Sequence, residues 1–246
     1  MRRLLEVCVE DVAGIEAAVT GGADRIELCA ALAVGGLTPA ASLVTAAAKA
    51  PIPVHLLARP RDGNFAYTAA EAALVAADIR AAADAGLAGV VIGASRPDHQ
   101  LDAELLAAWI AVARSAPRPL SLTLHRAFDL CPDPLAALET AITLGFDRIL
   151  TSGGAPKAID GRAMLAALVA AAGSRITILA GSGIDATTLP PLLETGVREV
   201  HASCRSAQGP ADAREIAFGF QAGPRLATDS AKVATLRNLL DAQPSA

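Results

Sequence analysis

The sequence has few of the residues that several common functions require. Aromatic residues make up only 3% of the chain, which is too few for the stacking surfaces of a single-strand nucleic-acid binder. The formal net charge is −4, and without a basic stripe neither nucleic acids nor anionic membranes are expected partners. The chain's lysines, Lys49, Lys157 and Lys232, all lie outside the predicted strands, which disfavours Schiff-base chemistry.

Several motifs and segments are also missing. No G-x-G-x-x-G or P-loop pattern occurs, which removes the usual nucleotide-binding motifs. No apolar run reaches the ~20 residues of a membrane-spanning helix, and the acid in M-R-R-L-L-E comes too early for a signal peptide. The 4 cysteines are too few for a disulfide framework and are expected to be thiols. We therefore expect a cytoplasmic protein.

Short β-type runs alternate with alanine-rich helical runs along the whole chain. The predicted strands are 4–10, 25–30, 54–59, 89–94, 119–125, 148–152, 176–181 and 199–204, and the predicted helices are 11–20, 38–49, 69–85, 102–115, 134–144, 162–172, 186–195 and 229–242. Such alternation predicts a parallel sheet, and this number of units predicts a single-domain (β/α)8 TIM barrel over residues 1–246. A doubly wound open sheet is the alternative fold.

Polar side chains share one face on five of the predicted strands. Side chains on a strand alternate between its two faces. The sets that share a face are Glu6, Cys8 and Glu10; Arg25, Glu27 and Cys29; His55 and Arg59; Thr123 and His125; and Glu199, His201 and Ser203. Burying polar groups is costly unless they are paired. These faces converge on one axis only in a closed barrel, so they favour the barrel and predict a functional interior.

In such a barrel the active site lies at the carboxyl ends of the strands. Two runs there combine arginine, which binds anions through paired donors, with histidine, the common acid–base group: residues 59–65 and 125–129. The expected acid–base groups are His125 with Glu27 or His201, and the expected substrate-binding groups are Arg59, Arg61, Arg126 and Asp129. The alternative is an internal salt-bridge network in which acids only balance these cations.

Ser182 lies in the run Gly181-Ser182-Gly183 that follows the predicted strand 176–181. Barrel phosphate sites often use the loops after the last two strands, with backbone N–H groups facing the anion. Ser182 is therefore a further candidate for substrate binding. Asp185 follows closely and would repel a phosphate or cap the next helix, so a plain turn is the alternative.

Cys8 and Cys29 are the candidates for a metal site. They lie on neighbouring predicted strands, face the same way and sit at a similar height. Soft thiolates select Cu(I) and zinc, and two thiolates can hold Cu(I). A buried cysteine can equally be a small hydrophobic side chain.

The longest predicted connection runs from about 205 to 228 and carries Phe218 and Phe220. Loops of this length are commonly functional or disordered. We interpret this one as either a lid or an oligomer contact.

Several runs, spread over nearly the whole chain, resemble a known family. They are L-L-E-V-C (4–8), G-A-D-R-I-E-L-C-A (22–30), G-G-L-T-P (35–39), I-P-V-H (52–55), R-P-R-D-G-N-F-A-Y (59–67), H-R-A-F-D (125–129), R-I-L-T-S-G (148–153) and E-V-H-A-S (199–203). Together they resemble the copper homeostasis protein CutC family. The resemblance implies a (β/α)8 barrel, a cytoplasmic location, a homo-oligomer (a dimer) and copper tolerance through Cu(I) binding at Cys8 and Cys29.

Two functions from different classes therefore stay open. The first is a copper-binding homeostasis protein. The second is a TIM-barrel enzyme acting on a small anionic molecule, such as a phosphorylated one, because the cations Arg59 and Arg126 cannot bind a metal ion.

Overall fold

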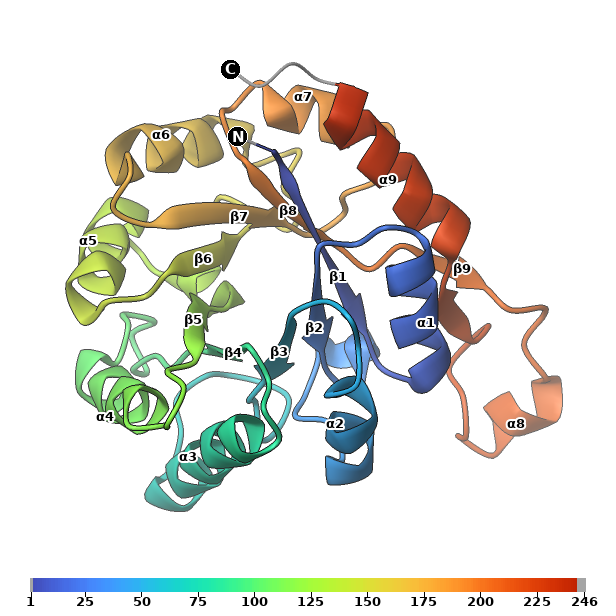
Figure 1. Ribbon diagram of the computed structural model, residues 1–246, viewed down its shortest axis with the longest axis horizontal. Helices are drawn as coiled ribbons and strands as arrows, with labels where there is room; N and C mark the ends of the chain where they lie inside the picture. The colour runs from blue at the N-terminus through green and yellow to red at the C-terminus, as the bar shows by residue number, and fades with distance from the viewer. Residues whose placement is uncertain (1, 243–246) are drawn as a thin grey trace.

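The computed structural model describes residues 2–242 and shows a closed barrel of parallel strands with helices around it (Figure 1). The strands follow one another around the barrel in chain order, and the last pairs with the first. They are β1 (Leu4–Val9), β2 (Arg25–Leu28), β3 (Val54–Leu57), β4 (Gly89–Ile92), β5 (Ser121–Leu124), β6 (Arg148–Thr151), β7 (Thr177–Gly181) and β8 (Glu199–Ala202). The predicted (β/α)8 barrel is confirmed, and the doubly wound alternative is wrong because β8 pairs with β1.

Helices follow the strands on the outside of the barrel. They are α1 (Val12–Thr20), α2 (Ala41–Ala47), α3 (Ala69–Asp84), α4 (Ala103–Arg114), α5 (Pro134–Leu144), α6 (Arg162–Ala172), α7 (Leu189–Leu193) and α9 (Ser230–Ala242), with 3-10 turns η1 (Leu32–Val34) and η2 (Arg126–Leu130). Helix α7 is shorter than the predicted 186–195 because the Asp185 carboxylate accepts the backbone N–H groups of Thr187 and Thr188, which makes a turn there. No helix in the described chain is long and apolar enough to cross a membrane.

The two faces of the barrel wall differ in chemistry. Alternate residues of β1, namely Leu5, Val7 and Val9, are buried in the apolar core that includes residues of the surrounding helices. Glu6 and Cys8, between them, turn to the barrel interior, as strand alternation requires. The apolar layer between strands and helices therefore supplies most of the hydrophobic stabilisation, and the interior holds polar groups beside a small apolar cluster of Cys8, Cys29, Leu57 and Val91.

A network of charged side chains lies in the barrel interior, beside the strands β1, β2, β6 and β8 that carry it. The Arg25 guanidinium pairs with the Glu6 carboxylate and, at 2.7 Å, with Glu199. Arg148 approaches Glu199 at 3.5 Å and donates to the hydroxyl groups of Ser121 and Thr123. The Glu6 side chain is 0% exposed and that of Arg25 is 5% exposed. Each buried charge in this network thus has an opposite charge beside it, as burial demands.

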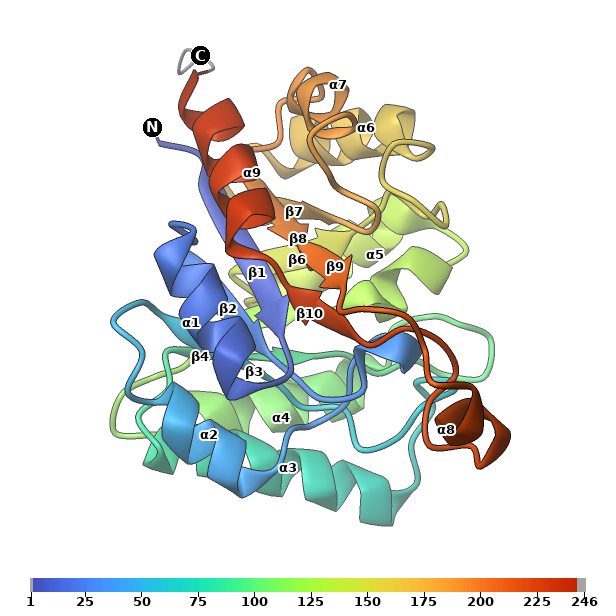
Figure 2. The same cartoon turned by 90° about the vertical axis from the view of Figure 1, so that its right-hand side faces the viewer.

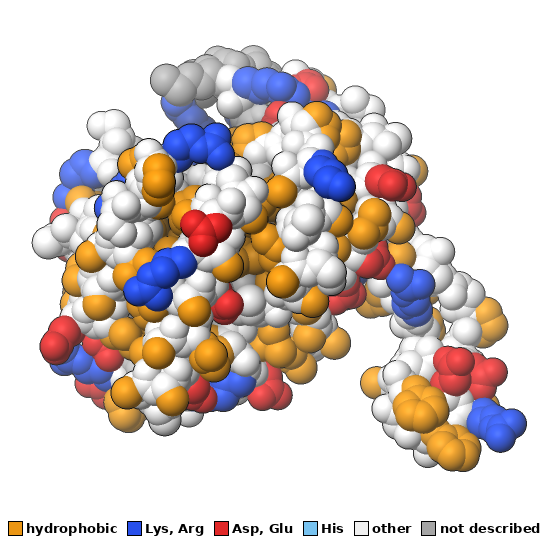
Figure 3. Space-filling model, turned by 60° about the horizontal axis from the view of Figure 1, so that its bottom comes forward, with side chains coloured by type: hydrophobic (Ala, Val, Ile, Leu, Met, Phe, Trp, Pro, Cys, Tyr) orange, Lys and Arg blue, Asp and Glu red, His pale blue; other side chains and the backbone are white. Residues whose placement is uncertain are grey.

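The segment after β8 forms an arm rather than an unstructured loop. It contains β9 (Arg205–Ala207), the short helix α8 (Ala213–Ala217) and β10 (Leu226–Thr228), and β9 and β10 pair as antiparallel strands. Figures 2 and 3 show α8 standing apart from the barrel, with hydrophobic side chains at the tip of the arm. In this position the tip does not cover the barrel, so the arm fits the predicted contact with another molecule better than the predicted lid.

Replacing Glu6 by glutamine is expected to lower the free energy of unfolding by about 3–5 kcal/mol, because it leaves the buried Arg25 charge undercompensated. Urea denaturation measures the effect. Glu139→Gln is the matched control, since it removes one partner of the exposed Arg175–Glu139 pair and should change stability little. Equal losses of stability in the two variants would contradict the claim that the buried network stabilises the fold more than an exposed ion pair does.

His55 predicts a dependence of stability on pH. Burial lowers the pKa of His55 from 6.5 to about 3, so between these values the unfolded chain binds more protons than the folded one. The effect of His55 on the free energy of unfolding is therefore absent well above pH 6.5. As the pH falls toward 3, His55 destabilises the fold increasingly. From pH 7.5 to pH 5 wild type should lose about 2 kcal/mol more than His55→Gln in urea denaturation. Parallel losses in the two proteins would refute the assignment of this effect to His55.

Candidate functional site

A cavity of about 450 Å³ opens at the carboxyl ends of the strands. It brings together most of the residues that the sequence singles out. The predicted site residues that line it are Cys8, Glu27, Arg59, His125, Arg126, Asp129, Ser182 and His201, and Phe65 and Arg205 also line it. Arg61 and Cys29 are not among the lining residues.

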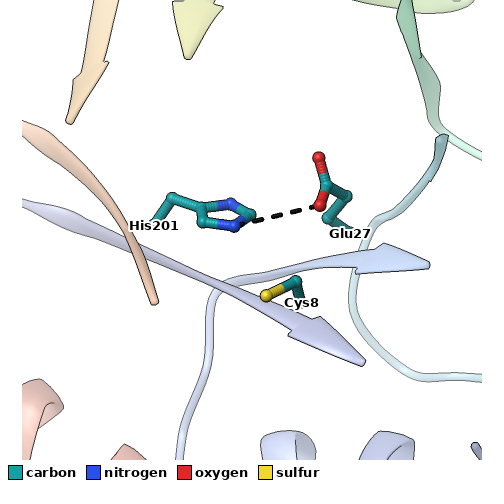
Figure 4. A group of neighbouring side chains, drawn as sticks. All are labelled: Cys8, Glu27 and His201. Atoms are coloured by element: carbon teal, nitrogen blue, oxygen red, sulfur yellow. Dashed lines mark ion pairs between the residues drawn. The ribbon is translucent and has the colours of Figure 1, made fainter. Parts of the chain in front are cut away.

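Cys8, Glu27 and His201 form a compact group inside the cavity (Figure 4). They come from β1, β2 and β8, which are neighbours around the barrel. One candidate ligand atom from each, a thiol sulfur, a carboxylate oxygen and an imidazole nitrogen, lies within 4.8 Å of the others. Cys8 and Glu27 are buried, and the His201 side chain is 11% exposed. The spacing and the atom types suit a metal ion.

The position of the His201 ring is set by Glu6. Nδ1 of His201 lies 2.7 Å from Oε1 of Glu6, and Nε2 lies 3.8 Å from Oε2 of Glu27. Burial opposes ionisation of Glu6, but Arg25 and His201 outweigh it and hold the pKa of Glu6 well below its usual range. Glu6 is therefore a carboxylate that accepts the Nδ1–H bond and leaves Nε2 facing Cys8 and Glu27. Burial also opposes protonation of His201, but Cys8 and Glu27 raise its pKa well above the usual value.

Glu27 carries a buried carboxyl group in the cavity whose pKa is shifted. Burial raises the pKa of its carboxyl from 4.5 to about 7, against the lowering effect of His201. A carboxyl group with a pKa near 7 can both accept and donate a proton at neutral pH. Perturbed carboxyl groups in a cleft are typical of functional sites.

Cys29 lies outside the group formed by Cys8, Glu27 and His201. Its Sγ donates to the Val9 carbonyl oxygen at 3.3 Å, and its side chain packs in one cluster with Cys8, Leu57 and Val91. Burial raises the pKa of Cys29 well above the usual value, and the nearby Cys8 and Glu27 add to this effect. Glu27 and His201 thus lie beside Cys8 in the cavity, and the predicted partner Cys29 shares a buried cluster with Cys8, so the predicted pair of thiols stays a prediction.

His125, the predicted acid–base group, is held by a hydrogen bond to the backbone. Its Nδ1 accepts the backbone N–H of Ala127 at 3.1 Å, so Nε2 carries the proton of the neutral ring. Burial, with the nearby charge of Arg59, lowers the pKa of His125 to about 3. Near neutral pH this imidazole is therefore uncharged and acts as a hydrogen-bond donor through Nε2–H.

The predicted anion-binding arginines separate into different environments. Arg59 is 6% exposed and donates to the carbonyl groups of Val34, Gly36 and Gly63. Arg61 pairs with Glu71 and donates to the loop that contains Asn64, outside the cavity. Within the predicted set, Arg59 thus remains the arginine that lines the cavity without pairing to an acid.

Arg126 and Asp129 serve mainly to hold the loop after β6. Arg126 pairs with Asp129 at 2.7 Å and donates to the Ser152 hydroxyl at 2.8 Å. The Asp129 carboxylate also accepts the backbone N–H groups of Ser152 and Gly154. These contacts favour the predicted salt-bridge alternative for this part of the site.

Ser182 lines the cavity at the end of β7 with a positive φ of 86°. Its hydroxyl donates to the Pro156 carbonyl at 2.8 Å. Asp185 caps the following turn through Thr187 and Thr188. These contacts therefore favour the interpretation of this segment as a plain turn.

Comparisons with known proteins agree with this architecture. A CutC protein of Sinorhizobium medicae is 51% identical over 242 residues and covers 98% of this chain and 97% of its own length. A CutC protein of Caulobacter vibrioides is 50% identical over 222 residues, or 89% of each chain.

A similar solved structure is that of CutC from Streptococcus agalactiae, a candidate copper homeostasis protein. It superposes with a TM-score of 0.76 at 30% identity and covers 82% of this chain and 98% of its own. The sequence model of the CutC family matches residues 3–206, which reach from β1 to the start of the arm. The chain belongs to the CutC family.

Proposed function

We propose that the protein binds Cu(I) at the group formed by Cys8, Glu27 and His201 and acts in copper homeostasis in the cytoplasm. The observation that carries the proposal is the compact arrangement of a thiol, an imidazole and a carboxyl group within 4.8 Å of one another. The description of the Streptococcus agalactiae relative as a candidate copper homeostasis protein supports it.

The contact between Glu6 and His201 adds a second argument. A histidine that binds a metal usually donates its other ring N–H to a carboxylate, which orients the ring. Glu6 stands in that position for His201, with the Nδ1–Oε1 distance at 2.7 Å. Glu6 is also tied to Arg25 in the interior network, so the ring is held firmly.

The donor set narrows the choice of metal. Thiolate and imidazole ligands suit both Cu(I) and Zn²⁺, whereas a carboxylate is a hard ligand that suits Zn²⁺ better. Cu(I) would use the Cys8 thiolate and His201 Nε2, and Glu27 would complete the site for Zn²⁺. The residues present therefore fit either ion. In both cases binding of the metal displaces the protons of the ligand groups.

Cys8→Ser is expected to lower Cu(I) affinity more than 100-fold because it removes the soft ligand, and Glu6→Gln is expected to lower it about 10–100-fold by releasing the His201 ring. Titration of the reduced protein against a competing Cu(I) chelator measures both effects. Zn²⁺ is titrated in parallel. If the two substitutions weaken Zn²⁺ binding more than Cu(I) binding, zinc replaces copper as the proposed metal.

Two cysteine variants sharpen this experiment. Cys131→Ser removes another buried thiol, outside the cavity lining, and should leave the affinity unchanged. Cys29→Ser distinguishes a site of three different residues, which it would leave intact, from the predicted pair of thiols, which it would break. Unchanged affinity in Cys8→Ser would rule out the metal site.

A second candidate function is that of an enzyme on a small anionic molecule. The observation that favours it is Glu27, whose pKa is about 7, in the same cavity as the cation Arg59. Glu27 with His201 would transfer a proton, and Arg59 would hold the negative charge of the substrate. Arg126, Asp129 and Ser182 would shape the mouth of the cavity.

The arm supports the expected homodimer. Phe218 and Phe220 are 65% and 80% exposed and stack with ring centroids 6.0 Å apart. Large aromatic side chains in this state are typical of protein contacts rather than of free surfaces. We propose that a second copy of the chain covers the tip of the arm.

The double substitution Phe218→Ser and Phe220→Ser is expected to convert the dimer into a monomer, because it removes the aromatic contact area. Size-exclusion chromatography with light scattering measures the mass. Leu74→Ser, which changes a side chain 57% exposed on α3, is the control. An unchanged mass in the double variant would argue against the arm as the contact.

A further inference from the structure

Arg59 is a buried cation without an acidic partner. It is 6% exposed, and its terminal nitrogens donate to the carbonyl groups of Val34, Gly36 and Gly63 at 2.8, 2.9 and 3.1 Å. Its Nε–H is buried and makes no hydrogen bond within the described residues, although the Tyr67 hydroxyl, also buried without a partner, lies close enough to Arg59 to interact with it. Carbonyl dipoles satisfy three of its donors, but its positive charge is not neutralised.

The other buried arginines of the described chain are treated differently. Arg25 pairs with Glu6 and Glu199, and Arg237 pairs with Asp24 and Asp241. The cations on the rim of the cavity have acids as well, Asp129 for Arg126 and Glu10 for Arg205. A purely structural role for Arg59 would therefore differ from that of the other buried arginines of the described chain, since an uncompensated buried charge is costly.

A second unpaired donor lines the same cavity. His125 is 5% exposed, and because Nδ1 accepts from Ala127, its Nε2 carries the hydrogen. Nε2 is buried and has no partner among the described residues. A buried donor left unsatisfied carries a desolvation penalty, and an acceptor supplied by a ligand would remove it.

Phe65 joins the two donors into one wall. Its ring centroid lies 5.1 Å from the guanidinium carbon of Arg59 and 4.8 Å from the centroid of the His125 ring. All three residues line the cavity. Phe65 supplies an apolar surface between a fixed positive charge and a neutral N–H donor, which is the composition of a small-molecule site that fixes orientation with a few polar groups.

We propose that this wall, formed by Arg59, His125 and Phe65, is a binding subsite for the carboxylate or phosphate group of a small organic anion. The charge of Arg59 and the Nε–H and Nε2–H donors would hold the anionic oxygens, and the remainder of the ligand would extend toward Glu27. The inference rests on the second candidate function and names its substrate class, but it does not depend on metal binding. A cavity of about 450 Å³ is large enough for such a ligand.

The test uses isothermal titration of the metal-free protein with inorganic phosphate and with malonate, at constant ionic strength set with chloride. Saturable binding is expected. Arg59→Lys, which removes the Nε–H donor, and His125→Asn should each weaken it about tenfold, the effect of about 1.4 kcal/mol expected for one hydrogen bond to a charged group. In His125→Asn the amide oxygen replaces Nδ1 as acceptor for Ala127 N–H, so the turn is kept while the Nε2–H donor is lost.

Arg61→Lys is the matched control. Arg61 lies in the same loop but is paired with Glu71 outside the cavity, so this variant should bind both anions as wild type does. Circular dichroism establishes that each variant is folded, and His125→Asn tests the subsite independently should Arg59→Lys fail to fold. A preference for one anion identifies a carboxylate or a phosphate as the natural group.

Absence of saturable anion binding in the wild type, or equal binding by wild type and His125→Asn, would overturn the proposal. Cys8→Ser separates it from the copper proposal, because that variant should lose Cu(I) and keep anion binding. Loss of anion binding in Cys8→Ser would likewise contradict a subsite that is independent of the metal.

Discussion

The ion pair between Glu6 and Arg25 is the interaction on which the barrel interior depends. It links β1 to β2, and the second bond of Arg25 to Glu199 reaches β8, so one guanidinium group ties three strands at the place where the barrel closes. Both charges are almost wholly buried, and neither would be stable alone in a low-dielectric interior. The closure of the sheet brings these charges together, and their pairing in turn stabilises the closed arrangement.

The same network determines the chemistry above it. Glu6 has one oxygen on Arg25 and the other on Nδ1 of His201, so the network also sets which ring nitrogen faces the cavity. This arrangement is possible because the apolar layer between strands and helices provides the hydrophobic core. The interior can then hold polar groups whose placement serves binding rather than packing.

The sequence predicts the fold and the location of the site but not the partners within it. Strand alternation puts Cys8, Glu27 and His201 on inward faces, and the barrel brings them to one end. Alternation does not show that Cys29 bonds to the Val9 carbonyl or that Arg61 turns to Glu71. It also cannot reveal that Ala127 occupies one nitrogen of His125. These outcomes depend on side-chain distances of a few ångströms, which a repeat of two residues does not encode.

Charge balance relates the two halves of the cavity. The group of Cys8, Glu27 and His201 offers ligand atoms to a metal ion, while Arg59 keeps a positive charge in the same cavity. A metal ion alone would leave Arg59 uncompensated and add a second cation to the same space. An anion bound at Arg59 would balance that charge and bring its other end toward the metal or toward Glu27. Under the two proposals a metal ion and an anion would therefore occupy the cavity together without either being required for the other.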